Sequence, residues 1–175
     1  MNPIFEIKGD NLKSSYSIYI IEFINKNISY FYIGQTGDNY VHSARSPFGR
    51  LAGHLSTITS STQNQIYKFA VKKAISVDRL KSKESFSNHE KKIIEEYLIK
   101  SVIKFYSFPL IEFNFNDTEI THKEKHRKIV ETEKHIIHLF EQKNKELINN
   151  KKSTRNKFHI YFPEFIELII KNFDL

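Results

Sequence analysis

The feature that most constrains the fold is a pair of short strand-like runs with a turn between them. Residues 17–23 read SIYIIEF and residues 29–35 read SYFYIGQ, and both are rich in β-branched and aromatic side chains. Asn25-Lys26-Asn27 lies between them, and asparagine is a common turn residue. Two such runs joined by a short polar turn predict a β-hairpin. Gly34 and Gly37-Asp38 predict that the second strand ends there and a loop follows.

The rest of the pattern predicts helices around a small sheet. The expected elements are a helix that starts at Ser46-Pro47 and buries Phe48, Leu51, Leu55 and Ile58, helices over 64–77 and 88–105, a break at Pro109, a strand over 110–115, a helix over 121–145, a basic loop over 149–157 and a helix over 163–173. Strands both before and after helices predict an α/β (α+β) fold with a small, mostly antiparallel three-stranded sheet and helices packed around it.

Length and composition narrow the class of protein. The 175 residues suit one domain, with a core over about 16–150, an inserted helix over about 88–105, and a C-terminal basic loop and helix over 151–175. The absence of cysteine excludes a disulfide and a thiolate nucleophile. No signal peptide and no membrane span is recognisable, so a soluble cytoplasmic protein is expected. A net charge of +7 and a pI near 9.4 favour a polyanionic partner.

Four separated motifs resemble those of the GIY-YIG nuclease family. They are Ser17-Ile18-Tyr19, Tyr32-Ile33-Gly34, Arg50 followed by His54 four residues later, and Glu133 in the long predicted helix. The resemblance extends over about residues 16–150, and it departs from the family where Ser17 replaces a glycine. It implies a magnesium-dependent (or manganese-dependent) DNA endonuclease with Tyr19, Tyr32, Arg50, His54 and Glu133 as catalytic residues.

The chemistry of these residues suits phosphodiester hydrolysis. The reaction needs an activated water, stabilisation of the charged phosphate and assistance to the leaving oxygen. A tyrosine has a pKa near 10, so Tyr19 or Tyr32 needs a nearby cation to act as a base, and the sequence leaves open which of them does. The resemblance gives Arg50 the scissile phosphate and places His54 near the tyrosines. The helical pattern predicts that Arg50 and His54 share a face turned away from the buried side, and Arg45 is a rival for the arginine role.

Glu133 occupies an unusual position for a carboxylate. On a helical wheel it falls within the apolar arc of Ile129, Val130, Ile136, Ile137 and Phe140. An acid among apolar side chains is costly unless it is paired or binds a metal. Within the resemblance, Glu133 is therefore the expected ligand of one Mg²⁺, an ion that keeps several waters and reaches substrate phosphates. A salt-bridged Glu at the edge of the stripe is the alternative.

Basic and amide residues near the C-terminus are expected to support the site or hold DNA. Asn149 resembles the family's closing asparagine, with Asn150 as a rival, and Lys151, Lys152, Arg155 and Lys157 are expected to contact the DNA backbone, as is the run 122–128. The inserted helix and this tail favour a stand-alone, site-specific enzyme of restriction type. Cleavage of both strands of a symmetric site favours a homodimer. The alternatives are a non-catalytic nucleic-acid-binding module and an RNA nuclease.

Overall fold

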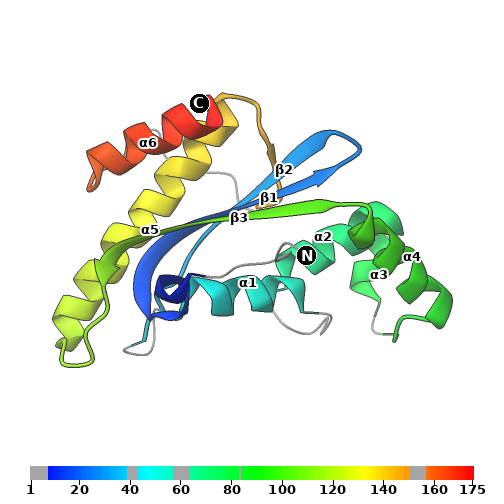
Figure 1. Cartoon of the computed structure of the whole chain (residues 1–175), viewed down its shortest axis with the longest axis horizontal. Helices are drawn as coiled ribbons and strands as arrows, with labels where there is room; N and C mark the ends of the chain where they lie inside the picture. Colours follow the sequence, from blue (N-terminus) through cyan, green and yellow to red (C-terminus); the bar gives the residue numbers. More distant parts are fainter. Residues whose placement is uncertain (1–7, 39–42, 57–63, 83, 150–156) are drawn as a thin grey trace, which may run out of the picture.

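The computed structural model describes residues 8–38, 43–56, 64–82, 84–149 and 157–175. In chain order, its elements are η1 (Gly9–Leu12), β1 (Ser15–Asn25), β2 (Ile28–Gln35), α1 (Pro47–Leu55), α2 (Gln65–Ala74), α3 (Val77–Lys81), α4 (Asn88–Ile99), β3 (Val102–Glu112), α5 (Glu119–Gln142), β4 (Glu146–Leu147) and α6 (Pro163–Phe173). Figure 1 shows the strands crossing the middle of the molecule with helices on both sides. The α+β class is thus confirmed.

The sheet has one more strand than the sequence predicted. Its order is β3-β1-β2-β4, so it is four-stranded, and β4 runs parallel to β2 while the other pairs are antiparallel. The three-stranded prediction was therefore wrong in detail. After α5 the chain reverses at Asn144, whose φ of 52° is left-handed, and Ile148 then donates its N–H to the carbonyl of Phe31. Two residues carry no periodicity, so a pattern search does not detect such a strand.

The predicted hairpin is confirmed, with a tighter turn. Asn25 pairs with Ile28, so the loop is Lys26 and Asn27 alone. Both have positive φ, 50° and 62°, as a two-residue type I′ turn requires. The twist of such a turn matches that of the two strands. Because the loop has two residues, it sets which residues of the two strands lie opposite each other.

β3 corrects two expectations. The helix predicted over 88–105 ends at Ile99, and the strand predicted over 110–115 begins at Val102 and runs through Pro109. Ser17, which faces Pro109, donates its N–H to Thr36 Oγ1, and its carbonyl accepts from Thr36 N, so both groups point toward β2. Pro109 therefore faces β1 without a ladder hydrogen bond, and its nitrogen lies toward the free edge of the sheet, where proline is tolerated.

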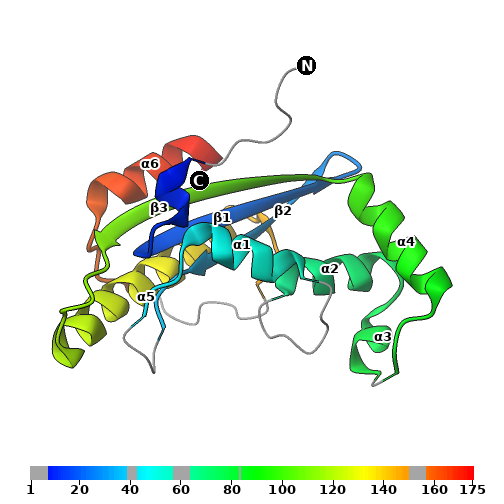
Figure 2. The ribbon, with the colours of Figure 1, turned by 60° about the horizontal axis from the view of Figure 1, so that its bottom comes forward.

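Two cores cover the two faces of the sheet. On one face Ile18, Ile20 and Ile33 pack against α5 and α6. On the other, Tyr19, Ile21 and Phe23 pack against residues of α1, α2 and α4. Figure 2 shows α1 and α2 lying across this second face. The alternation along β1 therefore sends every second side chain toward the face covered by α1, the helix that carries Arg50 and His54.

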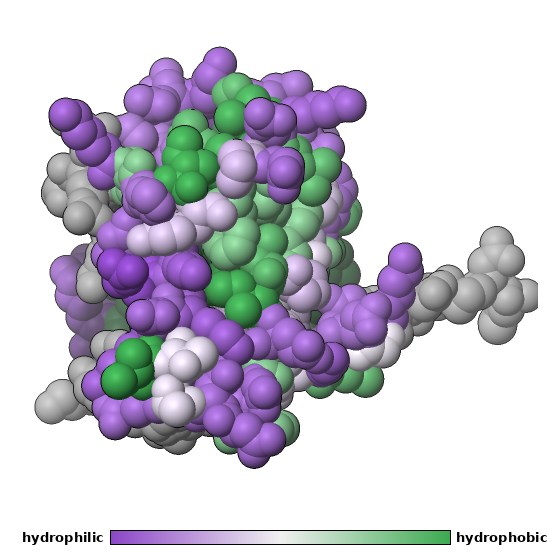
Figure 3. All heavy atoms as spheres, turned by 90° about the vertical axis from the view of Figure 1, so that its left-hand side faces the viewer, coloured by the Kyte–Doolittle hydropathy of each residue, from purple (hydrophilic) through white to green (hydrophobic). Residues whose placement is uncertain are grey.

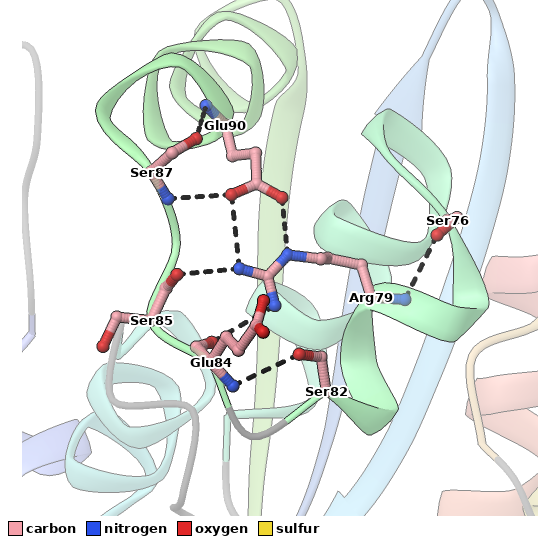
Figure 4. Close-up of polar contacts among 7 residues, drawn as sticks. All are labelled: Ser76, Arg79, Ser82, Glu84, Ser85, Ser87 and Glu90. Carbon is pink, nitrogen blue, oxygen red and sulfur yellow. Dashed lines mark hydrogen bonds and ion pairs between the residues drawn. The ribbon is translucent and has the colours of Figure 1, made fainter.

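The inserted segment is a small folded unit. The helix predicted over 64–77 ends at Ala74, and a further short helix, α3, follows from Val77 to Lys81. An arginine clamp joins α3 to α4 (Figure 4). Arg79 Nε donates to Glu90 at 2.5 Å, and its terminal nitrogens donate to the carbonyls of Glu84 and Ser85. Glu90 also accepts from Ser87 N in a capping box that begins α4. The insertion thus holds a defined shape beside the second face of the sheet.

The terminal helix occurs where it was predicted. α6 buries Phe165, Ile166 and Ile169 against the first face and leaves Leu168 and Ile170 exposed. Figure 3 shows a strip of hydrophobic side chains, framed by hydrophilic ones, on the end of the molecule occupied by α6 and the first half of α5. Among the residues that the structure describes, no helix has the length and apolarity to cross a membrane.

Candidate active site

Tyr19 and Tyr32 lie on the same face of the hairpin. Tyr19 is opposite Gly34 and Tyr32 is opposite Ile21, so the register turns both phenols toward α1. Their rings stack with centroids 6.3 Å apart, and Tyr19 is fully buried. A Cβ at Gly34 would overlap Cζ and Oη of Tyr19, so the glycine lets the ring of Tyr19 lie across β2. The convergence expected of the two hydroxyls is present.

His54 lies against these rings rather than away from them. α1 begins as predicted, with Ser46 Oγ accepting from Gly49 N and Pro47 in the first turn. Its buried residues include Leu51 and His54, whereas Leu55 is 38% exposed, so the predicted buried side was wrong by part of a turn. Ile58 lies outside the described residues. The His54 ring is 4.4 Å from that of Tyr32, and this aromatic contact turns the helix.

His54 is neutral and bonded to Tyr19. Its Nε2 is 2.8 Å from the Tyr19 hydroxyl, and burial, followed by the charge of Arg50, lowers its pKa to about 3. Nδ1 is buried with no hydrogen-bond partner among the described residues. A buried acceptor without a partner is more common than a buried N–H without one. The favoured tautomer therefore carries its proton on Nε2 and donates it to the Tyr19 oxygen.

The Tyr19 oxygen has further donor groups near it. Arg50 and Tyr32 oppose the rise that burial causes in its pKa, which stands at about 12. Burial and the neighbouring Tyr19 and Glu133 raise the pKa of Tyr32 as well, and its hydrogen bond to Tyr19 adds to that rise. Donors around a phenol oxygen favour its ionised form. The Tyr19 hydroxyl therefore loses its proton more readily than the Tyr32 hydroxyl.

Glu133 reaches the site from α5. Ile129 and Ile136 on the same stripe are fully buried, and the Glu133 side chain is half-buried within it. Burial raises the pKa of Glu133 to about 7, and the positive charges of Arg50 and Lys134 oppose that rise. Both tyrosines are within electrostatic reach of Glu133. The acid, the guanidinium and the phenols are therefore near enough to influence one another's ionisation.

These residues fit one hard cation held mainly by water and substrate. No cluster of three His, Cys, Asp or Glu occurs within the described ranges, and Glu133 is the carboxylate near Arg50 and the tyrosines that would hold the ion. Mg²⁺ commonly binds through one or two carboxylates and keeps its other waters. A half-buried carboxylate whose charge is penalised by desolvation is stabilised by such an ion. Arg50 Nε, which is buried without a partner among the described residues, remains available as a donor to a phosphate oxygen.

Asn149 supports the hairpin rather than contacting the face of the site. Its Oδ1 accepts from Ile33 N at 2.9 Å and its Nδ2 donates to Ile33 O at 2.8 Å, so one amide satisfies both backbone groups of the residue between Tyr32 and Gly34. The Asn149 amide thus clamps Ile33 and extends the contact between β4 and β2 along the edge of β2. The resemblance suggested Asn149, but not this double contact.

The other residues predicted to support the site or contact DNA have different placements. Four of them lie outside the described residues: Asn150, Lys151, Lys152 and Arg155. Lys157 is exposed. Part of the run 122–128 has partners within the protein: His122 is buried between the Tyr16 hydroxyl and the Asp38 carbonyl, and Lys123 and Lys125 pair with Glu119 and Asp117. Arg127 in the same run is exposed. Arg45, the rival arginine, is exposed and precedes α1.

Ser17 fits its buried position without disturbing Tyr19. Its hydroxyl lies 2.6 Å from Ser15 Oγ, and its backbone N–H donates to Thr36 Oγ1 at 2.8 Å. Thr36, which the sequence reasoning missed, also donates to the Ser15 carbonyl and so ties β1 to the end of β2. A threonine just after a strand carries no signal of such a role.

Comparisons with protein-family models, with curated proteins and with solved structures found no match to this chain.

Proposed function

We propose that this chain is a metal-dependent DNA endonuclease of the GIY-YIG type. The observation that carries the proposal is the surroundings of the Tyr19 oxygen, which contacts His54 Nε2 at 2.8 Å and has Arg50, Tyr32 and the Glu133 carboxylate in electrostatic reach. A packing tyrosine needs one partner for its hydroxyl, whereas a base needs its anion stabilised. The likeness to the family in the four motifs supports the same conclusion.

Each side chain then has a defined task. Tyr19 in its phenolate form accepts the proton of the attacking water and becomes a neutral phenol; before that transfer, the N–H of His54 and the hydroxyl of Tyr32 stabilise the phenolate. Arg50 binds the scissile phosphate and offsets the charge that develops on its oxygens. Glu133 would hold Mg²⁺ or Mn²⁺, which when bound supplies Lewis-acid stabilisation of the phosphate and its leaving oxygen.

A restriction-type enzyme is the subclass that we propose. The insertion α3–α4 and the basic tail are additions around a small core, and they offer surfaces for reading a DNA site. Cleavage of both strands of a symmetric site favours two copies, so we propose a homodimer that acts in the cytoplasm. Incubation of a long linear DNA with the protein and Mg²⁺ is expected to give discrete fragments, and a smear would contradict site specificity.

A binding module is the second candidate, because one observation favours it. Tyr19 is completely buried, so water and phosphate reach its oxygen only if the surrounding side chains move. Comparison of the wild type with Glu133→Gln separates the two functions. An enzyme loses cleavage and keeps DNA binding, whereas a binding module shows equal binding and no cleavage by either protein with Mg²⁺ or Mn²⁺. Competition with RNA of the same sequence tests whether RNA is the preferred substrate.

A further inference from the structure

A second cationic feature lies away from the candidate active site, at the hairpin turn. A pocket of about 350 Å³ is formed where the turn, the end of α2 and the second half of α4 meet. Lys26 from the turn, Lys73 from α2 and Lys100 after α4 line it, together with Glu96. All three lysines are exposed. Residues far apart in the chain thus bring three ammonium groups to one concave site.

The walls of this pocket are held rigidly. The two-residue turn leaves Lys26 little backbone freedom, and buried Asn25 donates its amide to Ser101 Oγ at 2.8 Å and to the Tyr97 carbonyl. Lys73 Nζ lies 4.7 Å from the centre of the Tyr30 ring, so its stem and charge are already positioned. A pre-formed site loses less entropy on binding than one that must order its lysines.

The charge of the pocket suits a phosphodiester. Glu96 and the carbonyl ends of α2 and α4 offset part of the three positive charges, and the remainder is about +1 if each helix end counts as about half a charge. A backbone phosphate carries one negative charge. A group with two or more negative charges would be neutralised less completely here than in a pocket lined by three lysines without Glu96.

The position of the pocket suits the same DNA that the active site would cut. Tyr30, beneath Lys73, is two residues from Tyr32 on the same strand and face. From Tyr32 to Ile28, where β2 begins, the strand spans about 13 Å at about 3.3 Å per residue, and Lys26 lies in the turn just beyond it. Phosphates of one DNA strand recur about every 3.4 Å along the helix axis, so this span matches about four nucleotides.

We propose that the pocket of Lys26, Lys73 and Lys100 binds a backbone phosphate of duplex DNA and sets its path across the protein. The inference rests on the proposed function for its substrate, and it assigns to the turn and to the end of α4 a task that the four motifs do not cover. Such a contact strengthens binding and fixes register without reading the base sequence.

The test measures binding rather than cleavage, at several salt concentrations, with Ca²⁺ in place of Mg²⁺ and a duplex of about two helical turns. The variant is Lys26→Gln with Lys100→Gln, and the matched control is Lys143→Gln with Lys171→Gln, which removes the same charge from α5 and α6. Lys73→Met, which keeps an apolar stem over Tyr30, is the second variant. The pocket variants are expected to bind several-fold more weakly, and the slope of log K against log salt is expected to be less steep by about 0.9 for one lost phosphate.

The outcomes separate this inference from the proposed function. Equal affinity and slope in the pocket and control variants would overturn the pocket site while wild-type cleavage leaves the nuclease intact. Weaker binding by the pocket variants without wild-type cleavage would support the site and contradict the nuclease. If wild-type protein binds no duplex, both fall. If inorganic phosphate raises the melting temperature of the wild type but not of the pocket variants, while their DNA affinities are equal, the site takes free phosphate and the DNA assignment is wrong.

Discussion

Replacing Gly34 with alanine tests whether the ring of Tyr19 must lie across β2. The new Cβ would overlap Cζ and Oη of Tyr19, and the ring has little room to move because it packs against His54, Tyr32 and Phe105. Overpacking of a buried site costs about 1–3 kcal/mol. For a chain of this length each kcal/mol lowers the melting temperature by about 2–4 °C, so we expect a loss of about 2–12 °C.

The same change is also expected to lower the cleavage rate strongly, in addition to its moderate effect on the melting temperature. The Tyr19 hydroxyl would leave its 2.8 Å contact with His54 Nε2, and displacement of a reacting group by about 1 Å costs on the order of 100-fold in rate. Thermal unfolding and initial cleavage rates measure the two effects. Gly9→Ala is the control, because nothing lies within 4 Å of a Cβ there.

Making the same substitution in a Tyr19→Ala protein tests whether the overlap with the Tyr19 ring is the cause. In Tyr19→Ala the ring is absent, so adding Gly34→Ala should cost little further stability, and the two changes should be strongly non-additive. If Gly34→Ala is as stable as the wild type, or if it destabilises Tyr19→Ala by the same amount as the wild type, the reasoning about the crossing ring is refuted.

Three further predictions concern the neighbours of that ring. Tyr19→Phe removes the oxygen that receives the His54 proton, so steady-state cleavage should fall by about 100-fold or more while the melting temperature changes by only a few degrees, and retained activity would exclude Tyr19 as the base. Asn149→Ala leaves the N–H and carbonyl of Ile33 without their partner, so chemical denaturation should show a loss of about 1–3 kcal/mol, and a neutral result would contradict the clamp. Because burial raises the pKa of Glu133 to about 7, the folded metal-free protein holds that proton more tightly than the unfolded chain; stability from this group is present below about pH 4.5 and is lost as pH rises through 7. Melting curves of Glu133→Gln should lack this fall, and a wild-type profile of equal slope would show that Glu133 is not desolvated.

Local patterns in the sequence were enough for much of the fold. The alternation of residues 17–23 and 29–35 and the polar turn predicted the hairpin, and its register follows once the two-residue turn is known. The cap at Ser46 and the stripe around Ile136 located α1 and α5 to within a few residues. These features depend on neighbours within about one or two helical turns, so they can be read from a short stretch of chain.

Contacts between distant segments decided the rest. The burial of His54 follows from the aromatic face of the hairpin, which overrode the apolar pattern of α1. Pro109 stays within β3 because Ser17 turns its backbone toward Thr36, and β4 exists because a reversal at Asn144 lays two residues beside β2. Such effects arise from backbone groups and rings that meet only in the folded chain. The sequence by itself therefore determined which residues could form a site, whereas the tertiary structure decided that Tyr19, and not Tyr32, is the oxygen toward which the donors converge.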